Sequence, residues 1–130
     1  MVKATSKDRR PVYLNLFKIR LPIAGIVSLA HRGSGVLMFL AMPFVVYLLD
    51  LSVQSSEGFE RAISILQHPV LVVAQLLFIW ALAHHLFAGI RFLLIDADIG
   101  IEKKPASMAA WLVMLLTASV VVIASIWMWL

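Results

Sequence analysis

The chain has 130 residues, of which 62% are hydrophobic and 14% charged, and its formal net charge is +4. A water-soluble domain carries about half apolar and about a quarter charged residues, so this composition excludes one and indicates an integral membrane protein. The sequence has no cysteine. Disulfides, cysteine-ligated zinc or iron–sulfur sites and c-type haem attachment within this chain are therefore excluded.

Residues 1–20 form a basic arm that holds six of the eleven Lys and Arg residues against one acid, Asp8. Next to a membrane span, such a cluster sets the orientation of the chain, and we expect no nucleic-acid partner. No cleavage site follows a short apolar core, so a signal peptide is not expected.

The first predicted span covers about residues 21–50, and Arg32 is the only charged side chain before Asp50. The segment is longer than the ~30 Å hydrocarbon core, so its first turns should protrude or the helix should tilt. Pro43 is a candidate kink. In the polar connection that follows, apolar residues recur at helical spacing around Phe59 and Ile63, which predicts a short surface helix.

The second predicted span covers about residues 69–95 and starts with Pro69 in its first turn, after a solvated His68. The third covers about residues 108–130, with Ser107 as its expected N-cap after stop signals at 103–105. An all-α membrane protein with three transmembrane helices follows, and residues 1–130 are predicted to be one transmembrane domain.

Lys and Arg are distributed unevenly between the two sides of the predicted spans. The N-terminal arm has six, the first connection has only Arg61, and the second has Lys103 and Lys104 with Arg91 beside it. The positive-inside rule then places the N-terminal arm and the second connection in the cytoplasm or an organelle matrix, and the C-terminus on the opposite side.

Two polar sites interrupt the first two spans, and depth counting predicts that they meet. Arg32 is 17 residues from Leu49, about 26 Å along the helix, and His85 is 15 residues from Val70, about 22 Å. Ionisable groups in a span are costly and by default mark a functional site.

On each helix, small residues share a face with the ionisable residue, at steps of three or four residues. The sets are Gly25, Ser28, Arg32 and Gly35 on the first helix and Ala81, His85, Ala88 and Gly89 on the second. Such residues either pack helices closely or leave room for a flat macrocycle. His85 is therefore a candidate haem axial ligand, and the alternative is a buried imidazole bonded to a neighbouring helix. His84 points about 100° away and cannot share that iron, so we expect it to pack.

Three further side chains have candidate roles. His31 and Arg32 can bind haem propionates, because Arg forks suit carboxylates; the alternative for Arg32 is snorkelling to lipid phosphates. Ser28 with Arg32 can bind a quinone carbonyl, and the alternative for Ser28 is a hydrogen bond to its own helix backbone.

At these residues the chain resembles the cytochrome b membrane-anchor subunits of succinate dehydrogenase, respiratory complex II. Ser28 to Gly35 fits the family's S-x-x-H-R-x-S/T-G motif, and His85 to Arg91 fits its H-x-x-x-G-x-R motif. Arg10-Pro11 fits its R-P pattern before the first span, Asp96 follows at the expected place, and residues 56–60 look like the loop of bacterial members. Phe92 departs from the histidine that many members have.

The resemblance implies that His85 ligates haem b, that His31 and Arg32 contact its propionates, and that Ser28 and Arg32 line the ubiquinone site. It implies a second, smaller anchor subunit that completes the bundle and supplies the other axial histidine. An iron–sulfur subunit and a flavoprotein subunit, which oxidises succinate, would dock on the cytoplasmic face of a bacterial inner membrane, with the C-terminus periplasmic. This chain would be non-catalytic for succinate by itself.

Two other functions stay open at this point: a cofactor-free structural anchor, and a small proton-coupled transporter subunit that uses His31, Arg32 and His85. The predicted spans contain no acid from 21 to 49 or from 70 to 90. That absence counts against a proton relay of the usual carboxylate kind.

Overall fold

The computed structural model describes residues 20–130, in which the chain forms four helices and no strand. They are α1 (Ile23–Gln54), α2 (Ser56–Leu66), α3 (Pro69–Asp96) and α4 (Lys103–Trp129). The three longer helices are long and apolar enough to cross a membrane. The predicted all-α fold with three spans and a short connecting helix is confirmed, while the basic arm, up to residue 19, lies outside the described residues.

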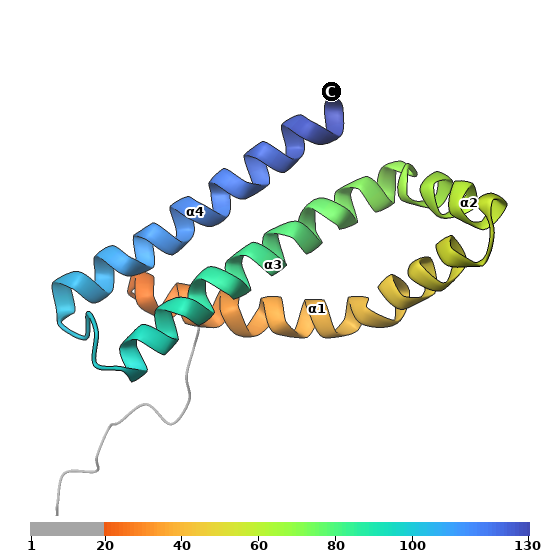
Figure 1. The fold of residues 1–130 in the computed structure, drawn as a ribbon. Helices are drawn as coiled ribbons and strands as arrows, with labels where there is room; N and C mark the ends of the chain where they lie inside the picture. Colours follow the sequence, from red (N-terminus) through yellow and green to blue (C-terminus); the bar gives the residue numbers. More distant parts are fainter. Residues whose placement is uncertain (1–19) are drawn as a thin grey trace, which may run out of the picture.

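The central helix of the arrangement is α3, which packs against both α1 and α4 (Figure 1). At one end of the molecule α1 begins, α3 ends and α4 begins; at the other end α2 joins α1 to α3. This order brings the start of α1, which carries residues 28–35, beside the last turns of α3.

Few side chains of residues 20–130 are buried, and the buried hydrophobic ones are all small. Val27, Ala88, Ala110 and Val113 form the core cluster at the contact of α1, α3 and α4. Large apolar side chains such as Phe39 and Leu115 remain mostly exposed along the helices. Such a surface suits contact with lipid and with partner helices rather than with water.

At the corner between α1 and α3, the N-caps of α2 and α3 follow from the local sequence. Ser55 caps α2, because its Oγ accepts a hydrogen bond from the Gly58 N–H at 3.0 Å. His68 caps α3 and Pro69 occupies its first turn, where a missing N–H costs no hydrogen bond. The predicted entry to the second span is confirmed.

Two predicted boundaries are wrong. The third span begins at Lys103 with Glu102 as N-cap, so Ser107 lies inside α4 and does not cap it. Pro105 does not stop the helix, because it sits in the first turn, where the backbone N–H has no intrahelical acceptor. The first span continues past Asp50 to Gln54, whose Nε2 donates to the Asp50 carboxylate at 2.7 Å.

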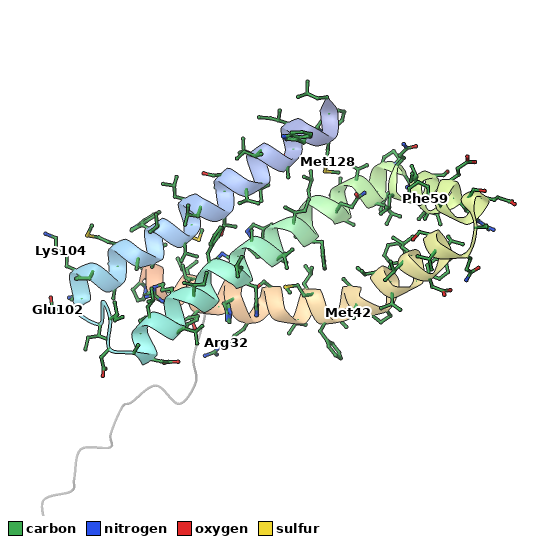
Figure 2. The ribbon with its side chains drawn as sticks, in the orientation of Figure 1. Arg32, Met42, Phe59, Glu102, Lys104 and Met128 are labelled. Carbon is green, nitrogen blue, oxygen red and sulfur yellow. The ribbon has the colours of Figure 1, made fainter. Side chains whose placement is uncertain are left out.

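The path of α1 changes in its second half. Pro43 lies inside this helix, and the ribbon turns toward α2 beyond Met42 (Figure 2). Proline removes one backbone hydrogen bond and its ring presses on the preceding turn, which bends a helix without ending it. A cavity of about 320 Å³ lies between the second half of α1 and the first half of α3, near α2.

The connection after α3 turns sharply through a backbone motif. The N–H groups of Asp98 and Ile99 donate to the carbonyls of Ile95 and Leu94, at 2.9 and 2.8 Å. These two bonds form a Schellman motif, in which Asp98 adopts the left-handed conformation with a φ of 60°. The motif ends α3 and sends the chain back toward α4.

We predict that Gly58→Ala destabilises the corner between α1 and α2. A Cβ at this position would overlap the backbone carbonyl oxygen of Leu51, and such overpacking costs about 1–3 kcal/mol. Thermal unfolding of the purified protein should show a lowered midpoint. Ser64→Ala, an exposed change in the same helix, is the matched control, and equal midpoints for the two variants would contradict the prediction.

Candidate functional site at the crossing of α1 and α3

The two polar sites expected from the sequence meet where α1 crosses α3. His85 of α3 lies against the turn of α1 that contains His31, Ser34 and Gly35. A Cβ at Gly35 would lie 3.1 Å from Cε1 of His85, so only glycine lets the imidazole approach this closely. The prediction that the sites meet is confirmed.

The surroundings of His85 fix which of its nitrogens carries the proton. Nδ1 lies 3.2 Å from the His31 carbonyl oxygen and 3.2 Å from Oγ of Ser34. The Ser34 hydroxyl donates its own hydrogen to that carbonyl at 2.7 Å, so its oxygen is left to accept. We therefore assign the proton to Nδ1, which donates to both oxygens. Nε2 then carries the free lone pair and has no hydrogen-bond partner among residues 20–130.

His31 packs directly on His85. The two imidazole rings are stacked, with centroids 4.0 Å apart and planes 17° apart. Phe92 places its ring against His31 edge-on at 5.2 Å, and a Cβ at Gly89 would lie 3.7 Å from the His31 Nε2. The aromatic residue that departs from the family motif thus helps to hold His31 in place.

His84 faces a different direction and is fully buried. Its Nε2 lies 3.3 Å from the Val27 carbonyl oxygen, and its ring stacks on Trp80. Its Nδ1 is buried without a partner in the described part of the chain. The prediction that His84 packs between helices, away from the side of His85, is confirmed.

Ser28 and Arg32 lie one turn apart on α1, with Ser28 half-buried and Arg32 exposed (Figure 2). Ser34, Ser119 and Ser125 each donate to a carbonyl of their own helix. Among residues 20–130, Ser28 makes no such bond.

The four residues of α3 that were predicted to share one helix face divide into two groups. Ala81 and Ala88 are fully buried within this chain, and Ala88 belongs to the core cluster, so both serve close helix packing. Gly89 and His85, by contrast, lie half-buried beside α1. Ala81 and Ala88 therefore serve helix packing, and only Gly89 beside His85 is placed to leave room for a ligand.

Two residues gain functions that sequence reasoning had not assigned. Ser34 is fully buried and holds His85, and Gly35 makes the close approach of His85 possible. Both follow His31 and Arg32 in the same short motif. Their position one turn beyond His31 was the available signal, because residues three or four apart share a helix face.

Comparisons with known proteins agree on one family. The family model described as "Succinate dehydrogenase/Fumarate reductase transmembrane subunit" matches residues 6–124. A succinate dehydrogenase cytochrome b556 subunit of Coxiella burnetii (strain RSA 493 / Nine Mile phase I) is 34% identical over 122 residues, which are 93% of this chain and 98% of that protein. The subunit of the same name from Paracoccus denitrificans is 30% identical over 101 residues, 78% of each chain.

We predict that Gly35→Ala displaces the His85 ring. The added methyl group would press on Cε1 at 3.1 Å, so Nδ1 should move from its two acceptors. In ¹⁵N-histidine NMR of the full-length protein in detergent, the His85 ring signals should shift. Gly33→Ala is the matched control, because a Cβ there has nothing within 4 Å. Unchanged His85 signals in Gly35→Ala would contradict the assigned contact.

Proposed function

The chain belongs to the family of succinate dehydrogenase/fumarate reductase transmembrane subunits. From this premise we propose that it is the cytochrome b membrane-anchor subunit of a succinate dehydrogenase complex, and that the crossing of α1 and α3 is its haem site. The observation that carries the proposal is the state of His85: its Nδ1–H is held by two oxygens and its Nε2 is left for a metal.

The residues at the crossing fit haem b. A metal-bound histidine usually donates its other N–H to a carbonyl or carboxylate, which fixes the ring and raises its basicity. His85 has this support in the His31 carbonyl and Ser34. Residues 20–130 bring together no group of three or more His, Asp or Glu side chains suited to a metal ion. The metal would therefore need its other ligands from a macrocycle and a partner subunit.

When bound, haem b supplies a reversible one-electron couple at the iron. The residues of this chain would ligate it through Nε2 of His85 and bind its propionates through His31 and Arg32. His31 is fixed by its contacts to His85 and Phe92, whereas Arg32 is exposed and its fork can reach a carboxylate. The second axial histidine would come from a smaller anchor subunit.

Ser28 and Arg32 are proposed to form this chain's part of the ubiquinone site. The hydroxyl of Ser28 can donate to a quinone carbonyl, and the guanidinium of Arg32 can stabilise negative charge on the same ring during reduction. Both lie near the end of the bundle where α1 begins. Reduction at this end would draw its protons from the adjacent aqueous phase.

We propose that this same end faces the cytoplasm of a bacterial inner membrane and carries the iron–sulfur and flavoprotein subunits. Among the described residues, it holds Arg20 and Arg32 near the start of α1, Arg91 near the end of α3 and Lys103 with Lys104 at the start of α4. At the opposite end, the described residues include one Lys or Arg, which is Arg61. The positive-inside rule favours this orientation, with the C-terminus in the periplasm.

We predict that His85→Ala abolishes the b-type haem signal in reduced-minus-oxidised spectra of the purified complex. The reason is that the other two histidines near the crossing are held in other positions: His84 is fully buried against α1, and His31 is packed between His85 and Phe92. His68→Ala, which changes an exposed histidine, should keep the signal. An unchanged spectrum in His85→Ala would show that the chain is a cofactor-free anchor or binds haem elsewhere.

We predict that Ser28→Ala and Arg32→Leu each slow quinone reduction about 10-fold or more, since hydrogen bonds from or to charged groups contribute roughly 1.5–3 kcal/mol. Electron transfer from succinate to an artificial acceptor at the flavin should stay intact. Ser119→Ala, which removes an exposed serine bonded to its own helix, should change neither rate. Equal losses in both assays would indicate misassembly and contradict the assignment of the quinone site.

A further inference from the structure

A groove of about 400 Å³ lies between the last turns of α3 and the first turns of α4. It is separate from the crossing of α1 and α3 and from the cavity near α2. Its walls include Phe87, Ile90 and Leu94 on α3 and Ala109, Leu112 and Leu116 on α4. These residues follow three- and four-residue steps, so each set lies on one helix face and the groove extends along both helices. Arg91 is the only charged residue of its described lining.

Arg91 is buried in an unusual state. It is 6% exposed, and its Nη2 donates to the Ala106 carbonyl at 3.2 Å. Its Nε is buried and has no hydrogen-bond partner in the described part of the chain. The guanidinium lies 5.5 Å from the centre of the Phe92 ring, and it forms no salt bridge with a carboxylate of residues 20–130. Its charge is therefore not neutralised by these residues.

The start of α4 increases the positive potential around Arg91 and so favours the binding of an anion there. Ala106 belongs to the first turn of α4, and the start of a helix carries partial positive charge. A buried cation without a counter-ion is costly, and here it sits beside the positive end of a second helix. The nearby acids of the connection, Asp96, Asp98 and Glu102, are exposed. An external anion would satisfy both the guanidinium and its free N–H.

The apolar walls of the groove indicate that the anionic group belongs to a molecule with an apolar chain. Arg91 lies five residues before the end of α3, about 8 Å along the helix, and we expect this position to be close to the membrane boundary. From there the apolar walls lead toward the middle of the membrane along Leu112 and Leu116. A phosphate at the rim with an acyl chain along the walls matches this distribution of charge and apolar surface.

We propose that this groove binds an anionic phospholipid, with its phosphate at Arg91 and one acyl chain between α3 and α4. The site shares no residue with the proposed haem and quinone sites, so it does not depend on them. The lipid would neutralise Arg91 and fill the space between two helices that meet through small residues.

The test compares delipidated complexes that receive phosphatidylglycerol or phosphatidylcholine. Retained lipid is counted by native mass spectrometry, and the thermal unfolding midpoint is measured in parallel. For the unmodified complex, phosphatidylglycerol should bind and raise the midpoint by several degrees, and phosphatidylcholine should not. Arg91→Gln should reduce bound phosphatidylglycerol about 10-fold, the loss expected when one charge-assisted pair is removed. Lys104→Gln, which removes an exposed charge at the same end, should retain most of it.

A second variant keeps the proposal testable if Arg91→Gln fails to assemble. Ala109→Phe fills the groove while leaving Arg91 in place, so it should also expel the lipid and should keep the b-type haem spectrum. The proposal is overturned if Ala109→Phe retains as much phosphatidylglycerol as the unmodified complex, or if phosphatidylcholine or inorganic phosphate raises the midpoint equally. In Ala109→Cys, a disulfide to a cysteine introduced in a partner helix would also overturn it, because a protein would then occupy the groove.

Discussion

The contact between His85 and the backbone of α1 is the interaction on which the rest of the site depends. One carbonyl, that of His31, accepts hydrogen bonds from both Ser34 and His85, and a glycine at position 35 lets the imidazole come close enough to reach it. These contacts hold α1 against α3, and they also decide which nitrogen of His85 faces a ligand. The same hydrogen bonds therefore hold the two helices together and orient His85 toward a ligand.

The chain is built to be completed by other molecules. Its own core is a small cluster around Val27 and Ala88, and most of its large apolar side chains point outward. Under the proposed function, a second anchor subunit would provide a further haem ligand and cover for the exposed surface.

Charge is concentrated where the helices leave the membrane at one end. Arg32 and Arg91 both lie there, but their surroundings differ: Arg32 is exposed on α1, and Arg91 is buried against the start of α4. An exposed guanidinium can serve reacting or bound groups at the boundary. A buried one without a counter-ion has its cost reduced by a permanent anion, which is why the two arginines are proposed to have different ligands.

Composition and spacing alone determined that this is a membrane protein with three spans, since apolar runs of this length have few other uses. Counting along the helices also predicted the meeting of residues 28–35 with His85, because helical rise converts sequence position into depth. The sequence does not determine every helix boundary: Pro105 predicts a stop, but a proline in the first turn is compatible with a helix, and α4 begins at Lys103.

Only the tertiary structure decided what individual side chains do at the crossing. Sequence could not show that Ser34 and the His31 carbonyl share one proton donor on His85, or that His84 faces Val27 instead. It also could not separate Ala81 and Ala88, which pack, from Gly35, which lets the His85 ring come close. Spacing fixes the direction in which a side chain leaves its own helix. Which atom it meets depends on where the neighbouring helix crosses, and that is a property of the packed structure.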